Sequence, residues 1–198
     1  MKKFALIGSG GHAREIMAQI GSKLTCFVDD FYANNEALPL STFNPDEFSL
    51  MIAVADSTDR ESIINRLPKN TTFFSWIHPT AILMDKNIMI GEGSFIGAYS
   101  ILTTNVVIGK HAIINRGNQI GHDCRIGDFF SIMPNAVIGG NVNIGDCVYM
   151  GSCSNIKEKI NICDNVTIGM NAAVVKDINV PGTYVGVPAK KYGYEIKT

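Results

Sequence analysis

The chain has no apolar segment approaching the roughly 20 residues that a helix needs to cross a bilayer. Its net charge is -1, so the charge balance does not favour nucleic acid or an anionic membrane surface as a partner. The apolar run at residues 4–7 is interrupted by glycines and is too short for a signal peptide. These absences predict a cytoplasmic protein with no membrane insertion and no nucleic acid partner.

Cysteine is also scarce. The chain has five cysteines, an odd number, and none of them form a C-x-x-C pair. Three of them fall inside a regular repeat described next, where a small apolar side chain fits a core. We therefore expect reduced packing residues and no disulfide framework.

The second half of the chain has an aliphatic residue at every sixth position, from Ile90 to Val180, and glycine often follows it. Neither a helical period of 3.6 nor a strand period of two gives this spacing, which is typical of the hexapeptide repeat of a parallel β-helix. Three hexads, or 18 residues, form one triangular coil. We expect the aliphatic residue to point into the prism and the glycine to turn the corner at positive φ.

The first part of the chain alternates strand-like and helix-like segments. Strands are expected at residues 4–7, 24–28, 50–55 and 71–76, and helices at 14–20 and 57–67, the second capped by Ser57. This alternation predicts a parallel sheet with βαβ crossovers. The sequence thus predicts an α/β domain of half-Rossmann type at residues 1–76 and an all-β domain with a tail at 77–198.

Gly8, Gly10 and Ala13 match the spacing of a dinucleotide-binding turn, and Asp29 follows about twenty residues later, where that fingerprint has an acid. The domain is only half of a dinucleotide-binding unit, so we expect a site for one nucleotide. Glycines at a helix start let backbone N–H groups approach phosphate. A tight turn without any ligand is the alternative.

His122 is the strongest candidate for chemistry. It occupies the third position of its hexad and should project outward from a corner, with Thr104 one coil earlier and Gly140 one coil later. A groove beside the imidazole could hold an elongated ligand, and Asp123 could raise the basicity of the ring. His111 is expected on an exterior corner without a role.

Residues 115–129, which include Asn115, His122 and Asp123, resemble the active-site segment of hexapeptide sugar acyltransferases related to sialic-acid O-acetyltransferase. The resemblance is greatest to the bacterial nucleotide-amino-sugar N-acetyltransferases. It spans the chain, since residues 8–12, 28–31, 52–55 and 186–190 also match in order.

This resemblance implies a left-handed β-helix, a homotrimer and acetyl transfer from acetyl-CoA to the amine of a nucleotide-linked 4-amino-4,6-dideoxy sugar. The positions matching the family's general base and its supporting acid are His122 and Asp123. The positions matching its nucleotide-sugar contacts are Gly10, Gly11, His12, Asp29, Asp30 and Ala55. The positions matching its acetyl-CoA contacts, between two subunits, are Ser131, Gly140, Ser152 and Met170. The family often has histidine where Ser131 stands and glycine where Ala55 and Met170 stand.

Several alternatives remain at this point. The acceptor could be a hydroxyl of sialic acid or of another sugar, the nucleotide could be UDP, dTDP or GDP, and the chain could be a nucleotide-sugar-binding β-helix without turnover. An NAD enzyme would need the missing second half-domain. A zinc β-helix enzyme of the carbonic anhydrase kind needs three convergent histidines, whereas the repeat region has only His111 and His122, so no metal is expected.

Overall fold

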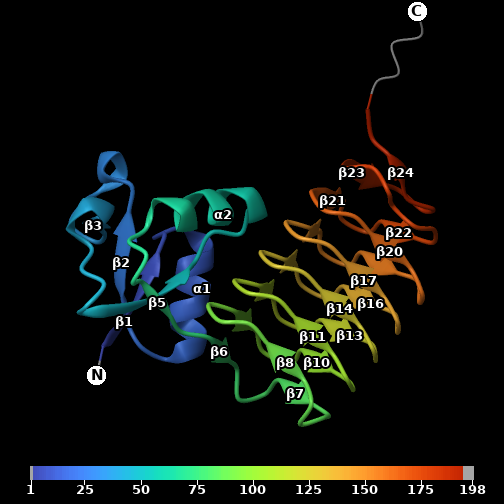
Figure 1. The fold of residues 1–198 in the computed structure, drawn as a ribbon, viewed down its shortest axis with the longest axis horizontal. Coiled ribbons are helices and arrows are strands. Elements are labelled where there is room, and N and C mark those ends of the chain that lie inside the picture. The colour runs from blue at the N-terminus through green and yellow to red at the C-terminus, as the bar shows by residue number, and fades with distance from the viewer. Residues whose placement is uncertain (1, 194–198) are drawn as a thin grey trace, which may run out of the picture.

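The computed structural model describes residues 2–193, which form an α/β domain packed against a stack of triangular coils (Figure 1). The α/β domain has one parallel sheet with the strand order β3-β2-β1-β4-β5. Its strands are β1 (Lys3–Ile7), β2 (Thr25–Val28), β3 (Leu38–Pro39), β4 (Phe48–Ile52) and β5 (Thr72–Phe73). Its helices are α1 (Gly11–Ile20), α2 (Ser57–Arg66) and two short 3-10 turns, Asp30–Tyr32 and Leu40–Thr42.

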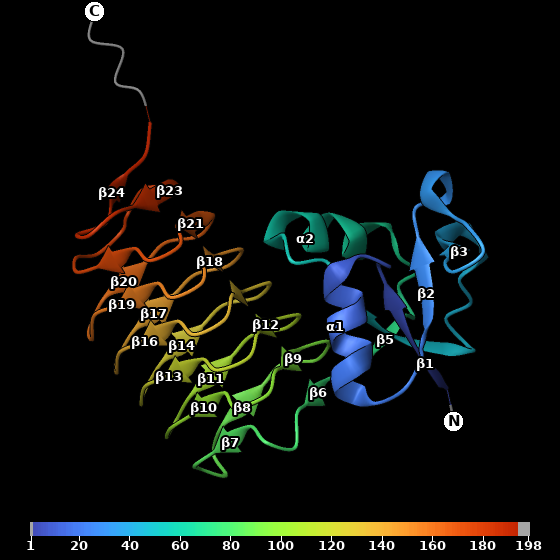
Figure 2. The ribbon, with the colours of Figure 1, turned by 180° about the vertical axis from the view of Figure 1, so that it is seen from behind.

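The two helices cover opposite faces of this sheet. Ile16 of α1 packs with Leu6 and Met51 on one face, in a cluster that also contains Phe95 of the coils. Ile63 of α2 packs with residues of the other face. Seen from behind, α1 lies between the sheet and the first coils (Figure 2). The sheet therefore buries both faces, which explains why its central strands read as continuous apolar runs.

The structure confirms the expected strands and helices of this domain to within three residues at their ends, apart from three differences. Strand β3 was not expected, because it is only two residues long. The expected strand at 71–76 is divided into β5, which pairs with β4, and β6 (Trp76–Ile77), which pairs with the coils. The N-cap of α2 is Asp56 and not Ser57, since the Asp56 carboxylate accepts from the Thr58 and Asp59 N–H groups at 2.9 and 3.0 Å.

The coils form three flat sheets of parallel strands. The first contains β7 (Ile82–Leu83), β10 (Ile101–Leu102), β13 (Gln119–Ile120), β16 (Val137–Ile138), β19 (Asn155–Ile156) and β22 (Ala173–Val174). The second contains β8 (Met89–Ile90), β11 (Val107–Ile108), β14 (Arg125–Ile126), β17 (Asn143–Ile144) and β20 (Asn161–Ile162). The third contains β6, β9 (Phe95–Ile96), β12 (Ile113–Ile114), β15 (Ser131–Ile132), β18 (Tyr149–Met150), β21 (Val166–Ile168), β23 (Gly182–Val185) and the antiparallel β24 (Lys190–Lys191).

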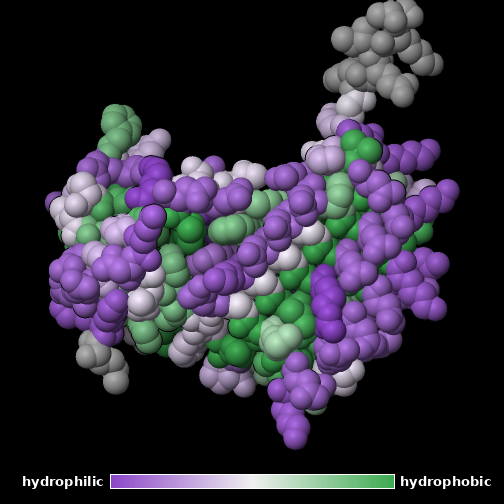
Figure 3. All heavy atoms as spheres, viewed as in Figure 1, coloured by the Kyte–Doolittle hydropathy of each residue, from purple (hydrophilic) through white to green (hydrophobic). Residues whose placement is uncertain are grey.

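Successive strands of each sheet pair with a shift of one whole coil, as the repeat predicts. Ile108 pairs with Ile126, and Ile126 with Ile144. These side chains enter a single core together with the residue four positions further on, such as the fully buried Phe130 after Ile126. The parallel β-helix is confirmed. On the face shown in Figure 3, a band of apolar and neutral side chains runs along the coils between hydrophilic margins.

The glycine of each hexad does not turn the corner, contrary to expectation. The left-handed residue lies two positions later, and this position recurs at Gly93, Tyr99, Asn105, His111, Gly117, Asp123, Phe129, Asn135, Asn141, Cys147, Cys153, Lys159, Asn165 and Asn171. The repeat glycine is needed for close packing instead, because a Cβ on Gly121 would lie 2.6 Å from the Gly140 nitrogen of the next coil.

The inward-facing pattern ends before Val180. Val180 is 52% exposed, and Ile178 enters the core in its place and forms a bridge with Ile162. The last coil is therefore shortened by two residues relative to the 18-residue repeat.

Candidate active site

His122 lies at the corner between β13 and β14, and its side chain is 56% exposed on the outer wall. Its Nδ1 is 2.8 Å from Oδ2 of Asp123. Neighbouring side chains on an extended strand point to opposite faces, but Asp123 has φ +60, and this left-handed corner turns its carboxylate toward the imidazole.

The Asp123 carboxylate is held in its ionised form. Hydrogen bonds from the Asn105 amide and then from His122 lower the pKa of Asp123 below its usual range. An ionised carboxylate only accepts hydrogen bonds, so a neutral His122 carries its proton on Nδ1. Nε2 is then left with a lone pair that can accept a proton from a reacting group.

Gly140 forms the wall against which the His122 ring rests. A Cβ on Gly140 would lie 2.5 Å from Nε2 and 2.7 Å from Cε1 of His122. The φ angle of Gly140 is not in the left-handed region, so the backbone conformation does not require glycine at this position. The imidazole requires it, because a Cβ would clash with the ring. The structure therefore brings together three of the expected residues, His122, Asp123 and Gly140.

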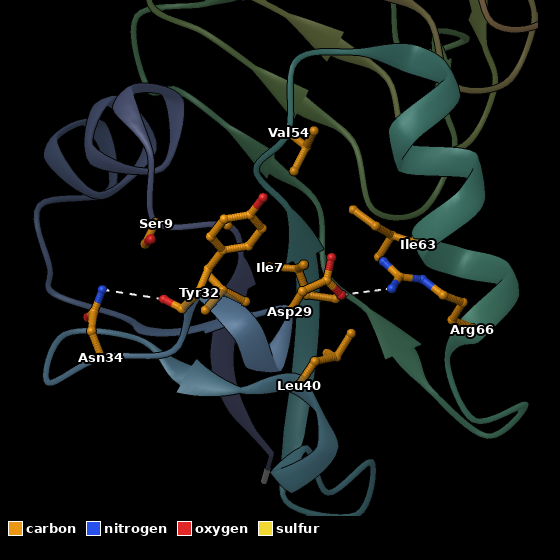
Figure 4. Close-up of a pocket in the computed structure, with 11 residues that line it drawn as sticks. Ile7, Ser9, Asp29, Tyr32, Asn34, Leu40, Val54, Ile63 and Arg66 are labelled. Carbon is orange, nitrogen blue, oxygen red and sulfur yellow. Dashed lines mark hydrogen bonds and ion pairs between the residues drawn. The ribbon is translucent and has the colours of Figure 1, made fainter.

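A separate cavity of about 420 Å³ opens at the carboxyl ends of β1, β2 and β4 (Figure 4). This is the edge at which parallel α/β sheets bind ligands. Asp29 lies in its wall and its Oδ1 accepts from Nη1 of Arg66 at 2.7 Å. The other lining residues are Ile7, Gly8, Ser9, Val28, Tyr32, Asn34, Leu40, Val54 and Ile63.

The remaining residues expected at the nucleotide site have different positions. Gly10 and Gly11 begin α1 beside the cavity, and no side chain caps the free N–H groups of this helix. Asp30 does not line the cavity, and its Oδ1 accepts from the Ser41 N–H at 3.0 Å. Burial against Phe95 lowers the pKa of His12, although Glu15 opposes this effect.

Ala55 lies at the contact between the α/β domain and the coils. Its carbonyl accepts from the Ser131 hydroxyl at 2.7 Å and from Arg60 at 3.0 Å. Ser131 has no exposed surface, because the α/β domain covers it. The Ser131 hydroxyl thus joins the two parts of the chain and has no side-chain surface available to a cofactor in this structure.

Arg60 is the central residue of this contact, and its role was not expected from the sequence. It is only 1% exposed although it is charged. Its guanidinium donates to Val54, Ala55 and Asp56 of its own domain and, across the contact, to the carbonyls of His111, Phe129 and Phe130. Burial lowers its pKa to about 10, so it keeps its charge at neutral pH. From the sequence, an arginine in the first turn of a polar helix is expected to be exposed to solvent, which is why this role was not predicted.

His111 lies on an exterior corner of the prism, as expected, but its burial was not expected. It lies outside the prism but is only 4% exposed, because its ring packs edge-on to Phe73 at 4.6 Å and stacks on Phe129 at 5.4 Å. Burial lowers its pKa to about 4. His111 is therefore a neutral packing residue beneath the α/β domain.

Ser152 and Met170 lie one coil apart at the corner between the sheet of β18 and the sheet of β19. Met170 is 70% exposed. His122 and Gly140 lie at a different corner, between β13 and β14 and one coil beyond. Arg60 and His111 place the α/β domain at the third corner. Within one chain, His122 and Gly140 therefore lie on a different edge of the prism from Ser152 and Met170, and Ser131 is buried beneath the α/β domain.

Among residues 2–193, no three His, Cys, Asp or Glu side chains gather closely enough to hold a metal ion. Over the same range, the helices are all too short or too polar to span a membrane. The five cysteines form no disulfide, and three of them, Cys26, Cys124 and Cys147, are buried as packing residues.

The repeated coils have counterparts among known proteins. The model of the bacterial transferase hexapeptide (six repeats) matches residues 123–158. Among curated proteins, the chain is similar to GDP-perosamine N-acetyltransferase of Escherichia coli O157:H7, with 28% identity over 154 residues, 69% of each chain.

Solved structures share the whole two-part fold. The acetyltransferase domain of PglB from Neisseria gonorrhoeae, in complex with acetyl coenzyme A, has 27% identity and a TM-score of 0.80 and covers 96% of this chain and 99% of that one. PerB from Caulobacter crescentus, in complex with CoA and GDP-perosamine, shares the fold with a TM-score of 0.85 at 24% identity over 98% of each chain. The resemblance to the nucleotide-amino-sugar N-acetyltransferases expected from the sequence is confirmed.

Proposed function

We propose that this chain transfers the acetyl group of acetyl-CoA to the amine of a nucleotide-linked amino sugar of the 4-amino-4,6-dideoxy type. The observation that carries the proposal is the exposed His122–Asp123 pair. Nε2 of the imidazole lies against the backbone of Gly140, where there is no side chain to block it. The N-acetyltransferase named among the curated relatives supports the choice of an amine as acceptor.

The reaction needs one base and no covalent enzyme intermediate. His122 Nε2 accepts a proton as the sugar nitrogen attacks the thioester carbonyl, so that an N–C bond forms and the C–S bond breaks. Asp123 stabilises the imidazolium that results. The imidazolium then returns the proton to the CoA thiolate that leaves. Holding amine and thioester together supplies much of the rate enhancement.

The cavity beside Asp29 is the proposed nucleotide site. The free N–H groups at Gly10, Gly11 and His12 give α1 an anion-binding end suited to a diphosphate. Asp29 ends β2, the position from which an acid reaches a ribose hydroxyl in this class of sheet. Asp30 would act through its backbone, because its carboxylate already accepts from the Ser41 N–H. Ala55 would act through its N–H group, because its carbonyl already accepts from Ser131 and Arg60.

We propose that the chain assembles as a homotrimer of left-handed β-helices, with domains at residues 1–76 and 77–198. The position of His122 and Gly140 on one prism edge and of Ser152 and Met170 on another supports this. Acetyl-CoA can touch His122 and Gly140 together with Ser152 and Met170 only if the edges of two subunits face each other. Free cysteines support a reducing, cytoplasmic location.

The test is a panel of UDP-, dTDP- and GDP-linked 4-amino sugars and free sialic acid, each incubated with acetyl-CoA and followed by free-thiol release. We expect thiol release with one nucleotide-linked amine and an acetamide product by mass spectrometry. His122→Ala should abolish it, whereas His78→Ala, at a half-buried histidine bonded to Thr80, should not. Turnover with sialic acid alone would favour O-acetylation, and binding of a nucleotide sugar without thiol release would indicate a non-catalytic protein.

A further inference from the structure

The His122–Asp123 pair has a third member, one coil below it. The amide Nδ2 of Asn105 donates to Oδ1 of Asp123 at 2.6 Å, while Oδ2 of the same carboxylate faces Nδ1 of His122 at 2.8 Å. Asn105 and Asp123 are separated by 18 residues, so the coil repeat places them directly above one another on one corner.

The backbone of Asn105 is fixed independently of this contact. It occupies the left-handed corner position with φ +53, a conformation that asparagine adopts more easily than most residues. Its N–H donates to Oδ2 of Asp85 at 3.3 Å, and its carbonyl accepts from Nη1 of Arg125 at 3.0 Å. The amide is thus aimed at Asp123 before any substrate binds.

We infer that Asn105 is a positioning residue for the acetyl transfer, which holds the Asp123 carboxylate in the orientation that fixes the tautomer and direction of the His122 ring. This inference rests on the proposed function of His122. An exposed carboxylate beside an exposed imidazole would otherwise rotate freely, because water competes for both groups. One bond to a rigid neighbour restricts the carboxylate to one rotamer.

Two variants separate the amide from the backbone. Asn105→Gly keeps a residue that tolerates positive φ and removes the side chain. Asn105→Asp keeps the shape, and asparagine and aspartate both tolerate this conformation, but it replaces the donor by a second carboxyl group. The matched controls are Asn165→Gly and Asn165→Asp, since Asn165 occupies the same left-handed position, φ +57, on another edge.

We expect kcat to fall about ten-fold in Asn105→Gly, the loss expected for one hydrogen bond to a charged group, with KM for both substrates within about two-fold of the wild type. Asn105→Asp should fall further, and the acid limb of its kcat profile should move to higher pH, because two adjacent carboxyl groups share a proton. The charged groups facing this cluster are His122, Arg125 and Asp85. The Asn165 variants should retain wild-type kcat.

Nitrogen NMR of the His122 ring provides a readout that needs no turnover. The wild type should show a single Nδ1-protonated tautomer, and the Asn105 variants a mixture. If the wild type shows no acetyl transfer but the tautomer changes as expected, the proposed function fails and the positioning role stands. Wild-type kcat and an unchanged tautomer in both Asn105 variants, or an equal loss in the Asn165 controls, would overturn the inference.

Discussion

Gly140 has no side chain, so the imidazole of His122 can lie directly against the backbone of the outer wall. Even a Cβ at this position would enter the volume of the imidazole, since the nearest ring atom is 2.5 Å from an ideal Cβ. The ring must then leave the orientation that Asp123 holds. Glycine is therefore needed at position 140 to position the imidazole, and not for the chain to fold.

Gly140→Ala is therefore expected to lower kcat by ten-fold or more, with a change in unfolding free energy below about 1 kcal/mol, as is usual for surface substitutions. Steady-state kinetics and urea denaturation of the variant measure both quantities. In the Asp123→Asn background, where the imidazole has already lost its carboxylate partner, the same substitution should have a smaller effect on kcat, because both residues act through the orientation of one ring. A full additive loss in the double variant would contradict this coupling.

Among the elements, helix α2 connects the two parts of the molecule. Its first turn holds Arg60, buried against carbonyls of the coils, and its last turn holds Arg66, whose ion pair with Asp29 is half-exposed at the nucleotide cavity. The same rigid helix thus ties the position of the cavity to the position of the prism. Ile63, between them, lines the cavity.

Arg60→Met is expected to lower the unfolding free energy by about 3 kcal/mol, because several buried carbonyls lose their donor. Arg66→Met is the matched control on the same helix. It should change stability by less than about 1 kcal/mol, as for an exposed ion pair, but raise KM for the nucleotide sugar. Chemical denaturation and kinetics distinguish the two. Equal stability of the two variants would show that Arg60 is not the tie between the domains.

The contact beneath α2 also gives the protein a pH-dependent stability. Burial keeps the pKa of His111 at about 4, whereas a free histidine titrates near 6.5. Below pH 6.5 the unfolded chain binds more protons at this site, so stability is lost as pH falls from 6.5 toward 4, by up to about 3 kcal/mol. Burial also lowers the pKa of His12, so this residue too makes the protein less stable as the pH falls.

Urea unfolding of the wild type and His111→Asn at pH 7 and pH 4.5 tests this expectation. Asparagine tolerates the left-handed corner of position 111, where φ is +54, and does not titrate in this range. The free-energy difference between the two proteins should shrink as the pH falls. A constant difference would mean that His111 is not buried in its neutral form.

Elements with a strong period were predictable from the sequence, and contacts between distant elements were not. The coil register follows from the aliphatic residue at every sixth position, and His122 follows from its place in the hexad. The burial of Arg60 and His111 was not predicted, because a contact between domains leaves no local pattern in the sequence. The short strand β3 and the corner conformation were missed for another reason, namely that two residues or one φ angle are too few to show a period.

In the whole molecule, the prism is a stack in which each coil touches only its neighbours, so stability is approximately a sum over adjacent coils. Ile126 lies between the coils of Ile108 and Ile144, whereas Ile90 begins the second sheet and has a partner on one side only. A cavity in the middle of the stack therefore removes contacts on two sides.

Ile126→Ala is expected to cost about 3–4 kcal/mol of unfolding free energy, within the range for buried isoleucine, and Ile90→Ala about half as much. Thermal and urea unfolding of both variants measure the difference. Equal costs would contradict nearest-neighbour stacking along the prism.

The left-handed corner recurs once per hexad with nearly the same φ and accepts asparagine, histidine, aspartate, phenylalanine and lysine alike. A supporting group such as Asp123 can therefore be installed at different levels of the edges that the α/β domain leaves uncovered, while the interior remains unchanged. Evolution or design could in this way move such supporting groups along the β-helix axis, one coil at a time.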